Sequence, residues 1–404
     1  MCAGNSADTP FRKSNDMKAG FAQTDISPLM PVKQAGFIQQ TEKRTEIRDR
    51  LYVQMIGMED EEKVLILLSA DALGMPADVQ QEIQERISDH WNKPVQVILC
   101  CTHTHFAPDI KDPKYRTQFV SQTSEMILRC SWQEVSEPGI SFRKAFFDGL
   151  GKSRISAYPS DQIFLSVIGL HDGNKELCDL IVYNCHPTVM NGYTPFFSAE
   201  YPGYVKRRLK ELHPDRDFIF LQSCAGDIST RFTRKSQDYK AMCELGEKLV
   251  CRAEEMLSEP ADLLPAGKIL TEQRTVSITH VFEPIDISEL PEGITEREIE
   301  TIRIGAQVRE KLAQKLDTLP KEVTLTALHA GRLCLIFCPN ELFSGYLKNL
   351  GSDTSMLVCY STGYGGYVTP PHFTALTYER FTDTWSDETK EEIASLIRNL
   401  SENR

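Results

Sequence analysis

The chain has 404 residues, of which 41% are hydrophobic, 25% charged and 9% aromatic, a globular composition that excludes disordered and collagen-like classes. It is long enough to bury a sizeable core, which excludes a small disulfide-stapled scaffold. Its 57 acidic residues outnumber its 45 basic residues, and the formal charge of −12 disfavours binding to nucleic acid or to anionic membranes.

The N-terminus and the cysteines bear on where the protein resides. No run of about 18 to 20 apolar residues is present, so we expect no transmembrane segment. Residues 1–16 predict a loose tail without the basic and apolar regions of a secretory signal. Several of the 12 cysteines, such as Cys100, Cys101, Cys334 and Cys338, lie in apolar runs, and no CxxC pair is present. This pattern is typical of reduced, buried thiols and predicts a cytoplasmic protein.

Apolar runs and helical periodicity predict an alternation of strands and helices. Buried strands are expected at residues 64–70, 95–101, 163–170, 180–183, 218–222, 323–328, 333–338 and 356–360. Helices are expected at residues 77–90, 202–212, 236–257, 295–316, 341–350 and 387–400.

Two local arrangements indicate the type of sheet. The helix at 77–90 links two apolar strands, which forms a βαβ unit and favours parallel pairing with both faces covered. Gly331, between two further strands, predicts a tight hairpin. We therefore expect an α/β fold with a mixed, largely parallel β-sheet flanked by helices on both faces. Residues 17–404 are expected to form a single domain, in which the irregular stretch 261–294 is the place for a seam.

Histidines follow the ends of two predicted strands. The strand at 95–101 continues into Thr102-His103-Thr104-His105, and residues two apart in an extended chain face the same side. The strand ending at 183 continues into Asn184, Cys185 and His186, where the same alternation directs Cys185 to the core if His186 faces a cleft. Since parallel sheets place reactive groups at strand ends, the pattern indicates a metal site there. The alternative interpretation is a set of polar loop histidines.

Other strand ends offer a carboxylate, a hydroxyl and a phenol. Glu341 follows the strand at 333–338, and a first-turn helix charge is the alternative interpretation. Ser229 follows Gly226-Asp227 and is either a turn residue or a nucleophile whose pKa a base or metal lowers. The glycine-rich loop that contains Tyr364 and Tyr367 is expected to bend so that it presents a phenol.

Taken in order, these motifs resemble those of the neutral/alkaline non-lysosomal ceramidase family, zinc-dependent amidases with a serine nucleophile. The family's Thr-His-Thr-His-Ser-Gly-Pro is similar to residues 102–108, its His-Pro-x-Ser-Met to 186–190 and its Gly-Asp-Val-Ser-Pro-Asn to 226–231. Its Pro-Gly-Glu-Phe is similar to 339–342, and its His-Tyr-Ile-Thr-Thr followed by Tyr-Glu to 366–370 followed by 378–379. An Asn-Arg-Ser-Pro segment is similar to 153–156, so the resemblance spans nearly the whole chain.

The resemblance implies a role for each matching residue. Two neutral imidazoles, a carboxylate and a phenol leave Zn²⁺ able to acidify a bound water or hydroxyl and to polarise a carbonyl. By the resemblance the zinc ligands are His103, His186, Glu341 and Tyr367, and the nucleophile is Ser229. Arg154 would help to hold the substrate carbonyl, and His105 would be a pocket histidine beside the ligands. Tyr378 and Asp227 would contact substrate.

Departures from the family bear on the substrate. The family's Ser-Gly is Phe106-Ala107 here, and its Pro-Asn is Thr230-Arg231; both pairs flank the pocket. Because the sequence ends shortly after the last predicted helix, we expect no immunoglobulin-like C-terminal domain. The expected activity is zinc-dependent hydrolysis of a linear amide in a small molecule or lipid. The residues support this type of reaction better than they support ceramide as the substrate. The alternatives are a metal-dependent esterase or sugar N-deacetylase that uses zinc-bound water, and a non-catalytic binding protein.

Overall fold

The computed structural model describes residues 17–37, 41–156, 158–287, 290 and 293–402. The tail expected at residues 1–16 lies outside this range. In the described part of the chain no helix is long and apolar enough to cross a membrane. The cysteines of these segments are free thiols, and most of them are buried. The cytoplasmic location and the single-domain organisation stay predictions.

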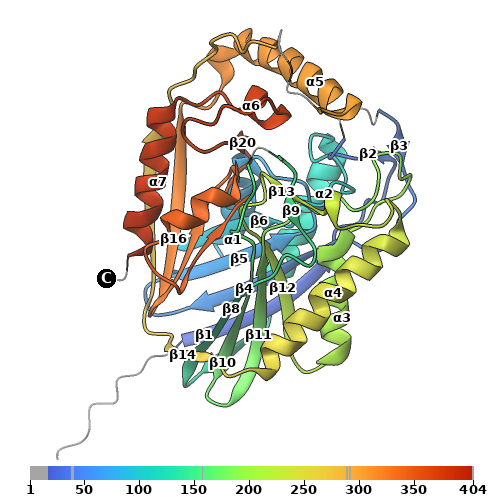
Figure 1. The fold of residues 1–404 in the computed structure, drawn as a ribbon. Coiled ribbons are helices and arrows are strands. Elements are labelled where there is room, and N and C mark those ends of the chain that lie inside the picture. Colours follow the sequence, from blue (N-terminus) through green and yellow to red (C-terminus); the bar gives the residue numbers. More distant parts are fainter. Residues whose placement is uncertain (1–16, 38–40, 157, 288–289, 291–292, 403–404) are drawn as a thin grey trace, which may run out of the picture.

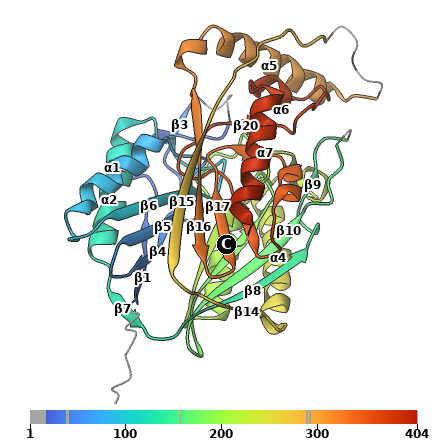
Figure 2. The same ribbon diagram turned by 90° about the vertical axis from the view of Figure 1, so that its left-hand side faces the viewer.

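Three mixed sheets surround a shared core, and helices cover their outer faces (Figures 1 and 2). The first sheet has the order β6-β5-β4-β1-β7, with β6 (Val95–Cys101), β5 (Val64–Ala70), β4 (Tyr52–Glu59), β1 (Met17–Asp25) and β7 (Trp132–Val135). The second has the order β12-β11-β10-β8-β14, with β12 (Asp217–Gln222), β11 (Lys175–Tyr183), β10 (Phe164–Asp172), β8 (Pro138–Phe146) and β14 (Asp262–Pro265). The third has the order β15-β16-β17-β19, with β15 (Ile269–Ser277), β16 (Glu322–Ala330), β17 (Leu333–Phe337) and β19 (Ser355–Val358).

Alternating side chains of the central strands supply both the shared core and the helix contacts. All seven residues of β5 are buried. Leu65 and Leu67 face the core between the sheets, whereas Ile66 and Leu68 pack against the helices. The first sheet is covered by α1 (Ala77–Ser88) and α2 (Pro113–Leu128), the second by α3 (Glu200–Leu212) and α4 (Tyr239–Ser258), and the third by α7 (Asp387–Ser401). The remaining helices are α5 (Glu296–Ala313) and α6 (Tyr378–Thr382).

Short strand pairs and backbone hydrogen bonds join the sheets at one end. β13 (Ile228–Ser229) pairs with β9 (Lys152–Ser153), β18 (Glu341–Leu342) pairs with β20 (Tyr367–Val368), and β2 (Val32–Lys33) pairs with β3 (Lys43–Arg44). The Cys359 amide donates to Gln222 O at 2.9 Å and the Cys101 amide to Tyr360 O at 3.0 Å. These bonds bring together the ends of β6, β12 and β19, so loops far apart in sequence meet there.

The predicted α/β class with mixed sheets and flanking helices is confirmed. All eight expected strands are present, and the hairpin at Gly331 is confirmed, with φ +57°. The parallel share is smaller than expected: β5–β6, β11–β12, β17–β19 and β18–β20 are parallel, and the other described pairs are antiparallel. The difference comes from four antiparallel strands that the sequence analysis did not predict, β1, β4, β8 and β15. Their sequences are half-exposed or interrupted, so they do not form the continuous apolar runs that indicate a buried strand.

Three further expectations are corrected. The helix expected at 341–350 is wrong: Glu341 and Leu342 form β18, and Ser344–Asn349 is a 3₁₀ helix. The stretch 261–294 is not irregular throughout, because it contains β14 and β15. Helix α2 was not expected, although Asp112 caps it by accepting from the amides of Lys114 and Tyr115, and a proline opens it.

Candidate metal centre and active site

His103 and His186 are held with the same ring nitrogen facing inward. His103 follows β6 with φ 65°, a left-handed conformation that a non-glycine residue adopts at a cost. Its Nδ1 lies 2.6 Å from Leu73 O, and His186 Nδ1 lies 2.5 Å from Ala225 O. Because a carbonyl oxygen only accepts, each Nδ1 carries a proton, and in the neutral form of each ring Nε2 carries a lone pair. Both side chains are buried.

The two lone pairs converge with a carboxylate oxygen. His103 Nε2 lies 3.2 Å from His186 Nε2, and Glu341 Oε2 lies 3.4 Å from the first and 3.2 Å from the second. No described group hydrogen-bonds Oε2 of Glu341, although it is buried. Two ligand atoms at about 2.0–2.1 Å from one tetrahedral zinc lie about 3.3 Å apart. The residues therefore fit a shared cation, which would relieve the repulsion among these acceptors.

Further donors surround this trio. Tyr367 OH lies 3.4 Å from His186 Nε2, because the pairing of β20 with β18 sets Tyr367 directly beside Glu341. His105 Nδ1 lies 2.8 Å from Gly36 O, and its buried Nε2 has no hydrogen-bond partner among the described residues. The nitrogens of His103, His105 and His186 lie within 4.8 Å of one another and form a group that could hold a metal. The structure thus groups His105 with the candidate ligands as well as with the pocket.

Two tyrosines that the sequence analysis did not include among the candidate ligands also contact the cluster. Tyr364 OH donates to Glu341 Oε1, the oxygen that faces away from the histidines. The Tyr360 ring stacks on His103 with centroids 4.0 Å apart. The glycines around Tyr364 could have indicated this contact, since they mark the bent loop that contains Tyr364 and Tyr367. The sequence does not decide which of these two phenols contacts which oxygen of Glu341.

Burial and neighbouring charges favour the protonation states that bind metals. Burial, followed by the charge of Arg154, lowers the pKa of His186 to about 4. Burial also lowers the pKa of His105, with His103 and His186 adding to the effect. Burial by itself raises the pKa of Glu341, but His103 and His186, in their protonated forms, outweigh it and hold that pKa well below its usual range. Neutral imidazoles and an ionised carboxylate are the forms that coordinate a cation.

Arg154 lies beside the cluster in a network of its own. Its Nη2 donates to Gly226 O at 2.7 Å and to Tyr367 OH at 3.1 Å, and it forms a 2.8 Å ion pair with Glu379. Burial opposes the charge on Arg154, but Glu379 and then Tyr367 raise its pKa further above the usual value. Its buried Nε has no acceptor in the described part of the chain. The three acceptors thus hold the Arg154 guanidinium in place beside the cluster.

Ser229 is positioned by the short strand β13. The main chain of β13 meets His186, whose amide donates to Ile228 O at 3.0 Å. The Ser229 hydroxyl accepts from the Arg231 amide at 3.3 Å. For Asp227, which the sequence analysis placed among substrate contacts, the structure shows a fully buried carboxyl that accepts from the Ser344 amide at 2.6 Å and the Ser344 hydroxyl at 2.7 Å. Asp227 holds the loop and does not line the cavity.

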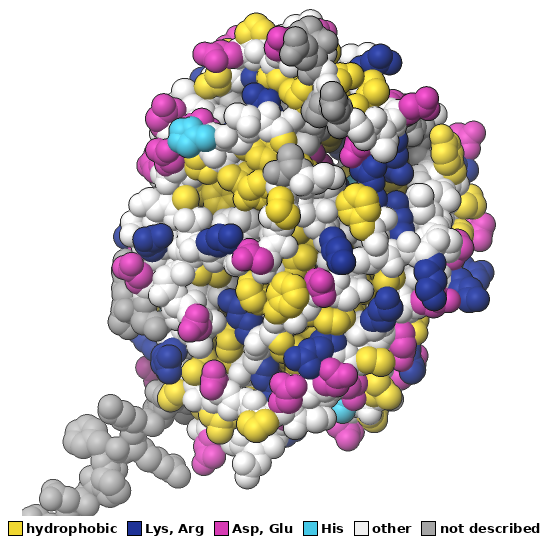
Figure 3. Space-filling model, viewed as in Figure 1, with side chains coloured by type: hydrophobic (Ala, Val, Ile, Leu, Met, Phe, Trp, Pro, Cys, Tyr) yellow, Lys and Arg dark blue, Asp and Glu magenta, His cyan; other side chains and the backbone are white. Residues whose placement is uncertain are grey.

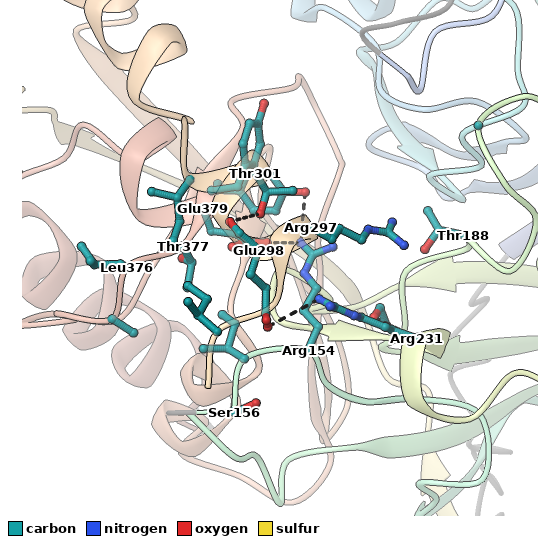
Figure 4. Close-up of a pocket in the computed structure, with 18 of the residues that line it drawn as sticks. Arg154, Ser156, Thr188, Arg231, Arg297, Glu298, Thr301, Leu376, Thr377 and Glu379 are labelled. Carbon is teal, nitrogen blue, oxygen red and sulfur yellow. Dashed lines mark hydrogen bonds and ion pairs between the residues drawn. The ribbon is translucent and has the colours of Figure 1, made fainter. Parts of the chain in front are cut away.

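A cavity of about 470 Å³ brings most of the predicted residues together. His105, Arg154, Ser229, Tyr367 and Tyr378 all line it. Figure 4 shows Arg154 beside Glu379 and Arg231 within this cavity. His103, His186 and Glu341 are not among its lining residues. As predicted from the alternation, Cys185 packs in the core under α3 and α4, away from the histidine nitrogens.

Fold and site together define an α/β protein with a histidine, carboxylate and phenol cluster at its strand ends. No protein-family model and no curated protein matches the sequence. Among solved structures, the neutral ceramidase from Pseudomonas aeruginosa matches with a TM-score of 0.74 at 15% identity, covering 96% of this chain and 74% of that one. A ceramidase complexed with C2 matches with a TM-score of 0.75 at 15% identity, covering 96% of this chain and 75% of the other. The chain therefore has the neutral ceramidase fold.

Proposed function

We propose that this protein is a zinc-dependent amidohydrolase that cleaves a linear N-acyl bond. The observation that carries the proposal is the convergence of three acceptors, on His103, His186 and Glu341, next to a cavity that holds Ser229 and Arg154. His103, His186, Glu341 and Tyr367 would hold the metal, and zinc in such a set polarises a carbonyl and acidifies a nearby hydroxyl. The likeness to ceramidase structures supports an amide as the substrate bond.

The chain's own residues divide the remaining work. Ser229 Oγ attacks the amide carbonyl carbon, and the proton it loses passes to Nε2 of His105, a residue that lines the same cavity. The Arg154 guanidinium, which lines the cavity, donates to the carbonyl oxygen as negative charge develops on it, a contribution typically worth about 3–4 kcal/mol. The C–N bond then breaks and the amine leaves with the proton from His105. Water hydrolyses the acyl-serine ester and releases the acid.

A second candidate is a metal-dependent esterase or sugar N-deacetylase with water as the nucleophile. The observation in its favour is the three-histidine group, because three imidazoles with one open position are a typical water-activating set. In this reading His105 is a ligand rather than a proton carrier. The two candidates differ at Ser229, because its hydroxyl is essential only to the first.

Metal content and turnover in matched variants test the proposal. We expect about one zinc per chain by elemental mass spectrometry, lost in His186→Ala and retained in His213→Ala, which removes a histidine that pairs with Glu254 far from the cluster. Ser229→Ala is expected to keep zinc and lose turnover of an N-acyl amide by roughly a thousandfold or more. Ser223→Ala, at another buried hydroxyl, should keep both. Absence of metal would overturn the proposal, and substantial activity in Ser229→Ala would select the second candidate.

A further inference from the structure

The cavity beside Ser229 contains more positive charge than the proposed chemistry uses. Arg231, Arg234 and Arg297 line it in addition to Arg154, and two glutamates are the only carboxylates among its described lining residues. Four guanidinium groups thus share two carboxylates, in a chain whose overall charge is −12. Figure 3 shows Lys and Arg side chains gathered at the edge of the hollow under α5. The excess is therefore a local feature and does not reflect the composition.

Both carboxylates are already engaged. Glu379 forms its ion pair with Arg154. Glu298 accepts from the amide and the hydroxyl of Thr295 in the capping box of α5, at 3.0 and 2.6 Å, and its other oxygen lies 3.9 Å from Arg231. This fixed arrangement holds Glu298 at the helix end, where it neutralises at most one of the three additional arginines.

Arg234 is a partly buried cation with no ion pair to a described carboxylate. Its guanidinium donates to the carbonyl oxygens of Thr188 and Val189, which fixes its position in the wall. Burial lowers its pKa, the nearby Arg297 and Arg231 lower it further, and Glu200 offsets only part of this. A desolvated cation beside other cations is costly, and a bound anion would offset that cost.

Arg297 lies in an unusual position for a basic residue. It belongs to the first turn of α5, where the positive end of the helix dipole disfavours cations. It is exposed and forms no ion pair within the described segments. Figure 4 shows its side chain extending from α5 in the direction of Thr188, the residue whose carbonyl Arg234 holds. Helix α5 and the segment after Ser229 therefore direct their cations to the same cavity.

We infer that the substrate carries an anionic group, a carboxylate or a phosphate, which binds Arg231, Arg234 and Arg297 while the scissile amide faces Ser229. The orientation of the amide rests on the proposed function, whereas the anion site rests on the three arginines. Planar guanidinium groups bind either anion through paired hydrogen bonds. An uncharged lipid amide would leave these cations without a counter-charge, so the structure points to an acidic N-acyl compound.

Matched probes of one chain length test this inference. N-octanoylethanolamine is neutral, N-octanoylglycine replaces its alcohol with a carboxylate, and the phosphate ester of N-octanoylethanolamine adds a phosphate. We expect kcat/KM for at least one anionic probe to exceed that of the neutral probe by about tenfold or more. The excess should shrink as the salt concentration rises, because screening weakens attraction at an open site. The better of the two anions identifies the group.

Variants on the same helix provide the control. Arg297→Gln is expected to lower the anionic-to-neutral ratio about tenfold, and Arg297→Glu to reverse it. Arg303→Gln, at an exposed arginine of α5 that does not line the cavity, should keep the wild-type ratio. Equal changes in the two Gln variants would overturn the inference, since they would indicate a general effect of surface charge.

Binding separates this inference from the proposed function. Calorimetric titration of the Ser229→Ala variant with each probe measures affinity without turnover. Tighter binding of an anionic probe, weakened about tenfold by adding Arg297→Gln, supports the anion site even if no amide is cleaved. Equal affinity for the neutral and anionic probes overturns the inference, whatever the enzyme hydrolyses.

Discussion

His103 Nε2 and His186 Nε2 face each other at 3.2 Å, although 83 residues separate them in the chain. The other nitrogen of each ring donates a hydrogen bond to a backbone carbonyl, so in the neutral form of both rings neither Nε2 can donate to the other. A cation held between the two lone pairs would relieve this contact. Residues that contact the proposed ligands without binding the metal themselves are therefore informative sites for mutation.

Loss of the Tyr364 hydroxyl should weaken metal binding. Tyr364 OH donates to Glu341 Oε1 and thereby orients Oε2 toward the histidines. We expect Tyr364→Phe to lower zinc affinity about 10–100-fold, as measured by competition with a chromophoric chelator. Tyr204→Phe removes the same type of hydrogen bond, to Glu247 at 2.8 Å, outside the site and should leave the affinity unchanged. An equal affinity in wild type and Tyr364→Phe would show that Glu341 is oriented by other contacts.

Replacement of Arg154 by lysine should impair turnover without removing the metal. A lysine carries the charge but cannot contact Gly226, Tyr367 and Glu379 and still offer a further donor. We expect kcat to fall about 100–1,000-fold with zinc content unchanged. Glu379→Gln, which releases one anchor of the guanidinium, should cause a smaller loss. A variant that changes KM alone would assign Arg154 to substrate binding rather than to stabilisation of the developing charge.

The buried ion pair of Lys206 and Asp71 should stabilise the strand-end region. Lys206 Nζ lies 2.8 Å from Asp71 Oδ1, both side chains are buried, and Asp71 also accepts from the Thr102 hydroxyl next to His103. Lys206→Met leaves the carboxylate unpaired, and we expect a loss of about 3–5 kcal/mol in the free energy of unfolding by urea.

A second lysine of α3 provides the comparison. Lys210 pairs with Asp217 at 2.9 Å, but both side chains are nearly half exposed. Lys210→Met should therefore cost no more than about 1 kcal/mol. Similar losses in the two variants would mean that burial of the Lys206 pair does not determine its contribution.

Asp227 should make stability depend on pH. Burial, only partly offset by the Ser344 hydrogen bonds, raises the pKa of Asp227 from 3.8 to about 6. The folded state then binds a proton more tightly than the unfolded state, so this contribution to stability is present below about pH 4 and is lost as pH rises through about 6. The full effect is about 3 kcal/mol.

The isosteric Asp227→Asn variant tests this directly. The asparagine stays neutral, so its free energy of unfolding should rise relative to that of wild type by about 2.4 kcal/mol between pH 4 and pH 7. Urea unfolding at the two pH values measures the difference. A constant difference between the two proteins would show that the carboxyl has the same pKa in the folded and unfolded chains.

The sequence by itself determined the central strands and the local chemistry at their ends. Runs such as Val64–Ala70 and Val95–Cys101 are apolar on both faces, and such strands are stable only in a sheet that is covered on both faces. His103 was therefore placed correctly just after a strand, whereas Glu341 was expected to begin a helix and instead lies in β18. The ordered resemblance of these motifs to one family indicated the same fold that the structural matches show.

Only the tertiary structure decided which of these ends meet and what lies around them. Edge strands such as β1 and β15 have half-exposed patterns that local periodicity does not separate from loops. The contact of Tyr364 with Glu341 and the approach of Arg297 to the Ser229 cavity depend on packing between distant segments. Local sequence fixes the conformation of a segment and the side chains it presents. The partners of those side chains depend on how the sheets close around a common core, and that closure is a property of the whole chain.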